Sequence, residues 1–176
     1  MFSFASIAFC EVDYWKLYEE SQPADFKLVH GIDPFQAQDY YEYAWAPYPL
    51  FRSSATLYYK DDAIPPGYYL LAPRTMKGRD YVFFKESGTV KYIIPVVKKE
   101  LVPEMFYENR IPRPKKTRWE TFCDNNSKRF HKLFKSSKKQ PPPQSYIETH
   151  RIDSNLTLMI LYYGNHKYYT LYKTKL

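Results

Sequence analysis

The sequence predicts a mainly β fold of the α+β class, in which antiparallel meanders form a sheet or a small barrel or sandwich. Two regions, 55–97 and 145–173, alternate strand-like runs with short turn signals. Aromatic residues make up 19% of the chain and include 19 tyrosines, which suits half-buried strands because the ring packs while the hydroxyl reaches water. We expect only two or three short helices, including a basic amphipathic helix at about 117–136.

The length of 176 residues suits a single domain. Residues 1–10 are apolar and uncharged, and they are either a signal-peptide remnant or a first strand. Small residues at Ser6 and Ala8 match a signal-peptidase site, so we favour the periplasm or cell envelope over the cytoplasm. Composition divides the rest into an aromatic acidic part at 11–54, a first meander at 55–102, a Pro-rich basic connector with a helix at 103–144 and a second meander at 145–176.

The first helix is predicted over 34–44. Asp33 can cap its free amides, Pro34 fits its first turn, and prolines follow its end. This helix would carry more aromatic side chains than a freely solvated helix normally does. We therefore expect it to pack on a sheet. The aromatic side chains that we expect to contact a partner are Tyr40, Tyr41, Tyr43, Trp45 and, in the second helix, Trp119.

The first meander is predicted to contain strands at 55–60, 68–73, 81–86 and 89–97. Lys77-Gly78 and Ser87-Gly88 are the turn signals between the last three. Pro95 has no amide hydrogen for a ladder, so its strand lies at an edge or ends there.

The second meander is predicted to contain strands at 145–152, 156–163 and 166–173. Its last turn, Gly164-Asn165, has the two-residue length of a tight hairpin. The middle strand is apolar at nearly every position and is therefore expected to be central. Since sequential strands usually lie side by side, the two meanders could form one continuous sheet.

Positive charge is concentrated between residues 110 and 139, which we call the basic element. It has eleven basic and two acidic side chains, giving 11 − 2 = +9, whereas the whole chain is +7 and the remainder therefore −2. Such a field attracts phosphates, acidic lipid or an acidic protein surface. The candidate partner-binding residues are Arg110, Arg113, Lys115, Lys116, Arg118, Lys128, Arg129, Lys132, Lys135, Lys138 and Lys139.

The helix within the basic element begins at Thr117, with Glu120 completing a capping box. Three placements are open. Its apolar face could pack on the chain's own sheet, it could lie on an anionic membrane surface, or its cations could neutralise nucleic-acid phosphates. We interpret the proline runs on either side of this helix as stiff spacers in preference to ligands for recognition domains.

No catalytic motif accompanies this element, and we predict no catalytic residue, metal site or cofactor. Glu148 and His150 share a strand face, but two ligands without a third are weak support for a metal. Cys10 and Cys123 make neither a disulfide framework nor a zinc site by themselves. No apolar run approaches the length of a membrane span.

The sequence therefore favours a non-enzymatic structural, scaffold or adaptor protein in a larger multiprotein assembly, with the bacterial cell envelope as one setting. It would dock other proteins through aromatic surfaces and the basic helix. An acidic protein or membrane surface fits the charge. The alternative is a nucleic-acid-binding protein that uses the 110–139 element.

Overall fold

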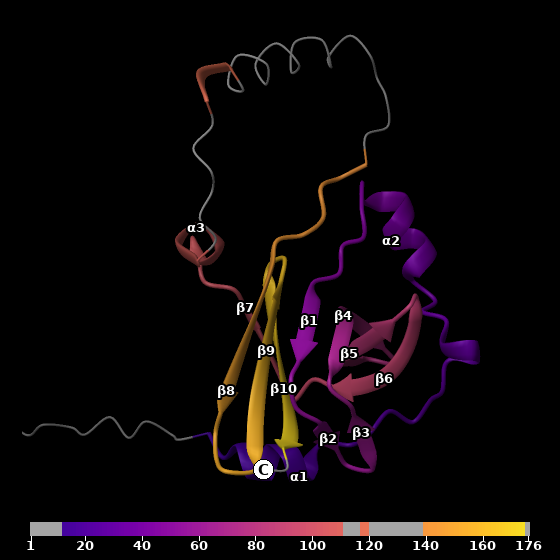
Figure 1. The fold of residues 1–176 in the computed structure, drawn as a ribbon, viewed down its shortest axis with the longest axis vertical. Helices are drawn as coiled ribbons and strands as arrows, with labels where there is room; N and C mark the ends of the chain where they lie inside the picture. The colour runs from indigo at the N-terminus through magenta and orange to yellow at the C-terminus, as the bar shows by residue number, and fades with distance from the viewer. Residues whose placement is uncertain (1–11, 111–116, 120–138, 175–176) are drawn as a thin grey trace, which may run out of the picture.

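Two open antiparallel sheets pack face to face in the computed structural model, which describes residues 12–110, 117–119 and 139–174 (Figure 1). The first sheet has the order β1-β4-β5-β6, and the second has the order β3-β2-β10-β9-β8, with β7 also paired to β10. The predicted mainly β fold is confirmed as a sandwich. The predicted strands at 68–73, 81–86 and 89–97 lie in the first sheet, whereas the predicted strand at 55–60 is β2 of the second sheet, so the expectation of one continuous sheet was wrong.

The strands of the first sheet are β1 Leu50–Ser53, β4 Gly67–Met76, β5 Arg79–Glu86 and β6 Thr89–Pro95. Those of the second are β2 Leu57–Tyr59, β3 Asp62–Ile64, β7 Lys98–Leu101, β8 Ser145–Arg151, β9 Leu156–Tyr163 and β10 His166–Thr174. The described helices are α1 Tyr14–Glu20, the short 3-10 helix η1 Val29–Gly31, α2 Gln36–Glu42 and α3 Phe106–Arg110.

The two hairpin turns of the first sheet have the predicted chemistry. Both central residues of each turn have positive φ, at 51° and 75° for Lys77-Gly78 and at 49° and 83° for Ser87-Gly88. This is the backbone of type I′ turns, whose twist matches that of the strands they join. β6 ends at Pro95 and lies at the sheet edge, as expected.

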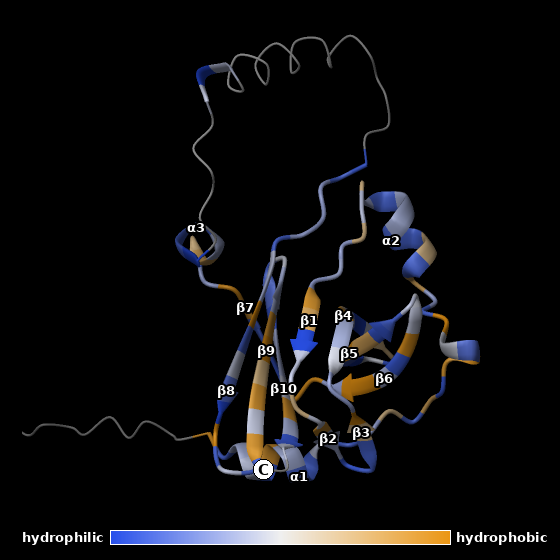
Figure 2. Ribbon diagram, in the orientation of Figure 1, coloured by the Kyte–Doolittle hydropathy of each residue, from blue (hydrophilic) through white to orange (hydrophobic). Residues whose placement is uncertain are grey.

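The main core lies between the inner faces of the two sheets. Phe84 of β5 meets Tyr172 of β10 edge-to-face, with ring centroids 6.1 Å apart, and Leu71, Ile94 and Met159 are buried around them. β9 lies between β8 and β10 and is apolar along most of its length (Figure 2). Its predicted central position is therefore confirmed.

Several short elements were not predicted from the sequence: α1, η1, β1, β3, β7 and α3. Their three to seven residues are too few to show a clear period. α1 has its own cap, because Asp13 accepts the amide of Lys16 at 3.0 Å. Its buried residue, Tyr18, holds the helix against the sandwich, because the hydroxyl of Tyr18 accepts a hydrogen bond from the amide of Lys60 at 3.0 Å.

The predicted basic helix at 117–136 falls largely outside the described residues, as do Cys10, Cys123 and the apolar N-terminal segment. Among the residues that the structure describes, no helix is long and apolar enough to cross a membrane.

Segment 22–48 crosses the outer face of the first sheet and comes very close to β6 at Gly31. Gly31 has φ +68°, and a Cβ atom placed there would lie 2.9 Å from the carbonyl oxygen of Val90. Both the left-handed backbone and the lack of space therefore require glycine at this position.

We expect Gly31→Ala to lower the free energy of unfolding by at least about 2 kcal/mol, because it adds a backbone clash to the left-handed strain. Gly78→Ala is the matched control, since Gly78 has φ +75° but a Cβ atom added there would have no heavy atom within 4 Å. It should cost about 1 kcal/mol. Urea unfolding of both variants measures the difference, and equal losses would show that the contact with Val90 does not matter.

Candidate interaction surface

Two basic side chains, Arg74 of β4 and Lys85 of β5, lie on the outer face of the first sheet. The strand register places both on the same face as Ala72, Tyr81 and Phe83. Segment 22–48 covers this face with apolar side chains. The side chain of Lys85 is only 1% exposed and that of Arg74 only 9%. Charges buried to this degree need partners.

Asp33 supplies a partner to both cations. Its side chain is fully buried, and Oδ2 lies 2.7 Å from Nη2 of Arg74 and 3.0 Å from Nζ of Lys85. Nε of Arg74 donates a further bond to Oδ1 at 3.1 Å. One carboxylate therefore joins two strands of the sheet to the segment that covers them.

Two residues of α2 and one that follows it complete the cluster. Arg74 also pairs with Asp39, and Tyr48 donates to Oδ2 of Asp39 at 2.6 Å. Nζ of Lys85 donates to Oε1 of Gln36 at 2.6 Å. We call Asp33, Gln36, Asp39, Tyr48, Arg74 and Lys85 the buried charge cluster. Its two carboxylates balance its two cations.

Electrostatics within this cluster favours the ionised carboxylate of Asp33. Burial by itself raises its pKa, but the hydrogen bonds and charge of Arg74, together with the bond from Lys85, outweigh this and hold the pKa below its usual value. Burial lowers the pKa of Lys85, although Asp33 partly offsets it. Burial and the bond to Asp39 raise the pKa of Tyr48.

Asp33 was predicted as a helix cap, and the structure modifies that role. The helix begins later than expected, at Gln36, after Phe35. Oδ1 of Asp33 accepts the amide of Phe35 at 3.1 Å, while the rest of the carboxylate binds the two cations. The signal that was missed is Lys85, which ends an apolar run and shares a face with Phe83.

The outer side of α2 and the residues after it carry exposed aromatic rings. The side chain of Tyr41 is 82% exposed and that of Trp45 is 68% exposed. Tyr40 is also exposed, and its ring lies 6.3 Å from that of buried Tyr48. Tyr43 is half-buried. Three of the four predicted aromatic contacts in this region are therefore available to a partner.

The end of the basic element is attached to these aromatic residues. Nζ of Lys139 donates to the carbonyl oxygen of Tyr40 at 2.6 Å. The backbone amide of Gln140 donates to the carbonyl oxygen of Glu42 at 2.8 Å, and the backbone amide of Ala44 donates to the carbonyl oxygen of Gln140 at 2.9 Å. A parallel bridge thus holds residues 139–140 beside α2. We call Tyr40, Tyr41, Trp45 and Lys139 the aromatic-basic surface.

The other end of the basic element is anchored to the second sheet. Arg110 is the last residue of α3, and its Nη2 atom lies 3.5 Å from Oε1 of Glu148 on β8. In Figure 1, α3 and α2 lie toward the same end of the sandwich. Arg118 and Trp119 are exposed. The remaining predicted basic contacts fall outside the described residues: Arg113, Lys115, Lys116, Lys128, Arg129, Lys132, Lys135 and Lys138.

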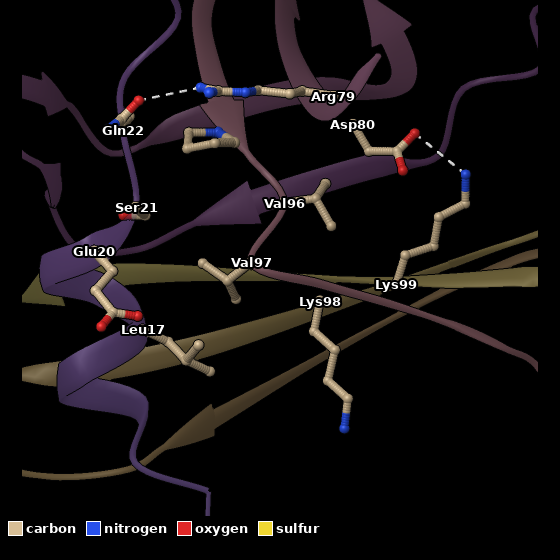
Figure 3. A pocket seen from close by; sticks show the side chains of 11 residues that line it. Leu17, Glu20, Ser21, Gln22, Arg79, Asp80, Val96, Val97, Lys98 and Lys99 are labelled. Carbon is tan, nitrogen blue, oxygen red and sulfur yellow. Dashed lines mark hydrogen bonds and ion pairs between the residues drawn. The ribbon is translucent and has the colours of Figure 1, made fainter.

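A separate open cleft of about 350 Å³ lies between α1, the start of β5 and the crossover from β6 to β7 (Figure 3). Two pairs of its polar side chains bind each other. Arg79 donates to Gln22 at 3.3 Å, and Nζ of Lys99 lies 3.2 Å from Asp80. The pair of Lys99 with Asp80 is neutral overall, whereas the neutral amide of Gln22 leaves the charge of Arg79 in place. We assign no ligand to this cleft.

The candidate metal pair also has another role. His150 Nε2 lies 3.5 Å from Glu148 Oε2, and the same oxygen accepts a hydrogen bond from Tyr162 at 3.0 Å. Within the described part of the chain, no group of three or more His, Cys, Asp or Glu side chains could hold a metal ion.

Comparison with known proteins gives no further information about this surface. No family model, no curated protein and no solved structure matches the chain.

We expect Asp33→Asn to lower the free energy of unfolding by about 3–5 kcal/mol, because it leaves Arg74 and Lys85 buried without their shared counter-charge. The control is Asp25→Asn, which removes an exposed pair with Lys77 and should remain close to wild type. Chemical denaturation measures both. An Asp33 variant as stable as the Asp25 variant would contradict the role of the cluster.

The depressed pKa of Asp33 also predicts a pH dependence. A carboxylate that titrates near pH 3.9 when unfolded and lower when folded stabilises the fold above about pH 5. That contribution is lost as the pH falls through the folded pKa. The unfolding free energy of the wild type should therefore fall more steeply between about pH 5 and pH 2 than that of Asp33→Asn. Parallel curves would exclude Asp33 as a source of acid sensitivity.

Proposed function

We propose that this chain is a non-enzymatic scaffold or adaptor that binds an acidic protein partner through the aromatic-basic surface and the basic element. The observation that carries the proposal is the attachment of Lys139 and Gln140 to α2, beside the two most exposed aromatic side chains of the region. Charge and aromatic contact area, which lie far apart in the sequence, are adjacent there.

The residue types suit a protein interface. Tyr41 and Trp45 offer large contact areas with few rotatable bonds, and such side chains commonly dominate binding energy. Behind them, Asp39 and Gln36 tie α2 to the first sheet. A surface held in place before binding loses less entropy when the partner arrives, and this raises affinity.

The charge indicates the chemistry of the partner. The basic element has a net charge of +9, and both described ends of it are anchored to the sandwich, at Arg110 and Lys139. Such a field accelerates encounter with an acidic surface and is screened by salt. We therefore propose a partner with an acidic patch beside an apolar pocket that accepts an aromatic ring.

The double variant Tyr41→Ala/Trp45→Ala should lower retention of the partner at least about tenfold, because a central aromatic contact typically contributes about 2 kcal/mol. The measurement is quantitative affinity capture of the full chain from nuclease-treated extract of its native cells. The control is Leu101→Ala/Met105→Ala. These two exposed apolar side chains lie on β7 and next to α3, outside the aromatic-basic surface.

Retention by the control and loss by the aromatic variant would support the proposal. Equal retention by both variants would contradict it. Capture that disappears on nuclease treatment would instead favour the nucleic-acid alternative, for which binding to an oligonucleotide should weaken steeply with salt.

A further inference from the structure

The free edge of β8 differs from every other described sheet edge. β1 has four residues and follows Pro49, and β3 has three residues and precedes Pro65. β7, which pairs only with β10 among the described strands, has four residues. β6 has a register irregularity opposite β5 and ends at Pro95. Short strands, bulges and prolines are the usual means of preventing edge-to-edge pairing.

β8 has none of these features. It has seven residues, pairs with β9 in unbroken register and contains no proline. Within the described part of the chain, β9 is the only strand paired with it. Its last three residues, Thr149 to Arg151, are exposed. A long, regular and open edge of this kind is a template for another strand.

Two hydrogen bonds determine which backbone groups point outward. The amide of Ile152 donates to Leu156 at 2.9 Å, and the amide of Gly164 donates to Gln144 at 2.8 Å. The backbone amide and carbonyl groups of the even-numbered residues of β8 therefore point toward β9, because hydrogen-bonded positions alternate along an antiparallel strand. The amide and carbonyl groups of Ser145, Ile147, Thr149 and Arg151 face away from the sheet.

We propose that β8 pairs with β8 of a second copy of this chain, antiparallel and centred on Thr149, so that the second sheet continues across a two-fold dimer. Two copies of one strand are self-complementary about such an axis. This inference concerns self-association and is independent of the proposed function.

Charge favours this register over the neighbouring one centred on Glu148. Centring on Thr149 places Glu148 of each copy opposite His150 of the other, on the face that carries both side chains. Centring one residue earlier would place the two Glu148 side chains opposite each other, and like charges directly opposite are destabilising. In the first register Thr149 pairs with itself and exchanges two backbone hydrogen bonds.

Thr149→Pro tests the pairing. Proline removes only an outward amide hydrogen, so the bonds between β8 and β9 are kept. Two hydrogen bonds are lost per dimer, and self-association should weaken at least about tenfold. Thr149→Val retains the amide and should dimerise like the wild type. Sedimentation velocity of the full chain over a concentration series measures association, and circular dichroism checks that each variant is folded.

Cross-linking tests the register without relying on a proline. In a Cys10→Ser/Cys123→Ser background, Thr149→Cys should form a disulfide-linked dimer on oxidation, because paired Cα atoms would lie about 5.5 Å apart. Arg151→Cys is the control, since its two copies would be offset by four residues, or about 13 Å. Preferential cross-linking at 149 supports the proposal. A wild type that stays monomeric at all concentrations, or equal cross-linking at both positions, overturns it.

Discussion

The ion pairs that Asp33 makes with Arg74 and Lys85 are the interaction on which the outer layer of this protein depends. The outer face of a sheet in a two-layer sandwich normally carries side chains that water can reach, but here two cations are covered. Segment 22–48 can cover that face only if it supplies negative charge, because an unpaired buried cation is far more costly than a paired one. Asp33 and Asp39 supply it from one short stretch of chain.

This constraint links the interior to the surface. α2 has seven residues, too few to be stable as an isolated helix. It is held in place because Gln36 and Asp39 bind Lys85 and Arg74 beneath it. The residues that follow can then form the bridge to Gln140, which brings the end of the basic element next to the exposed rings. The aromatic-basic surface is thus assembled from segments about one hundred residues apart.

The parts of the fold that could be predicted from the sequence are those with local causes. β9 was predicted with its observed bounds because its apolar run lies between two clear turns, and Lys77-Gly78 can adopt the positive φ angles of its hairpin. A sandwich was among the predicted architectures, but the assignment of strands to the two sheets could not be predicted, since pairing depends on contacts distant in sequence. The buried charge cluster was missed for the same reason: Lys85 looks like the polar end of a strand until the covering segment is placed. At the candidate surface, Tyr40, Tyr41 and Trp45 are exposed and their role as partner contacts stays a prediction. Their proximity to Lys139 requires the three-dimensional structure.

Hydrogen–deuterium exchange of the wild type and Asp33→Asn, under conditions where both are folded, tests most directly whether the buried charge cluster holds the outer layer. If it does, exchange accelerates in residues 36–48 of the variant and is unchanged in β9, because only the covering segment loses its anchor. Unchanged exchange in 36–48, or equal acceleration in both regions, would contradict this role of the cluster.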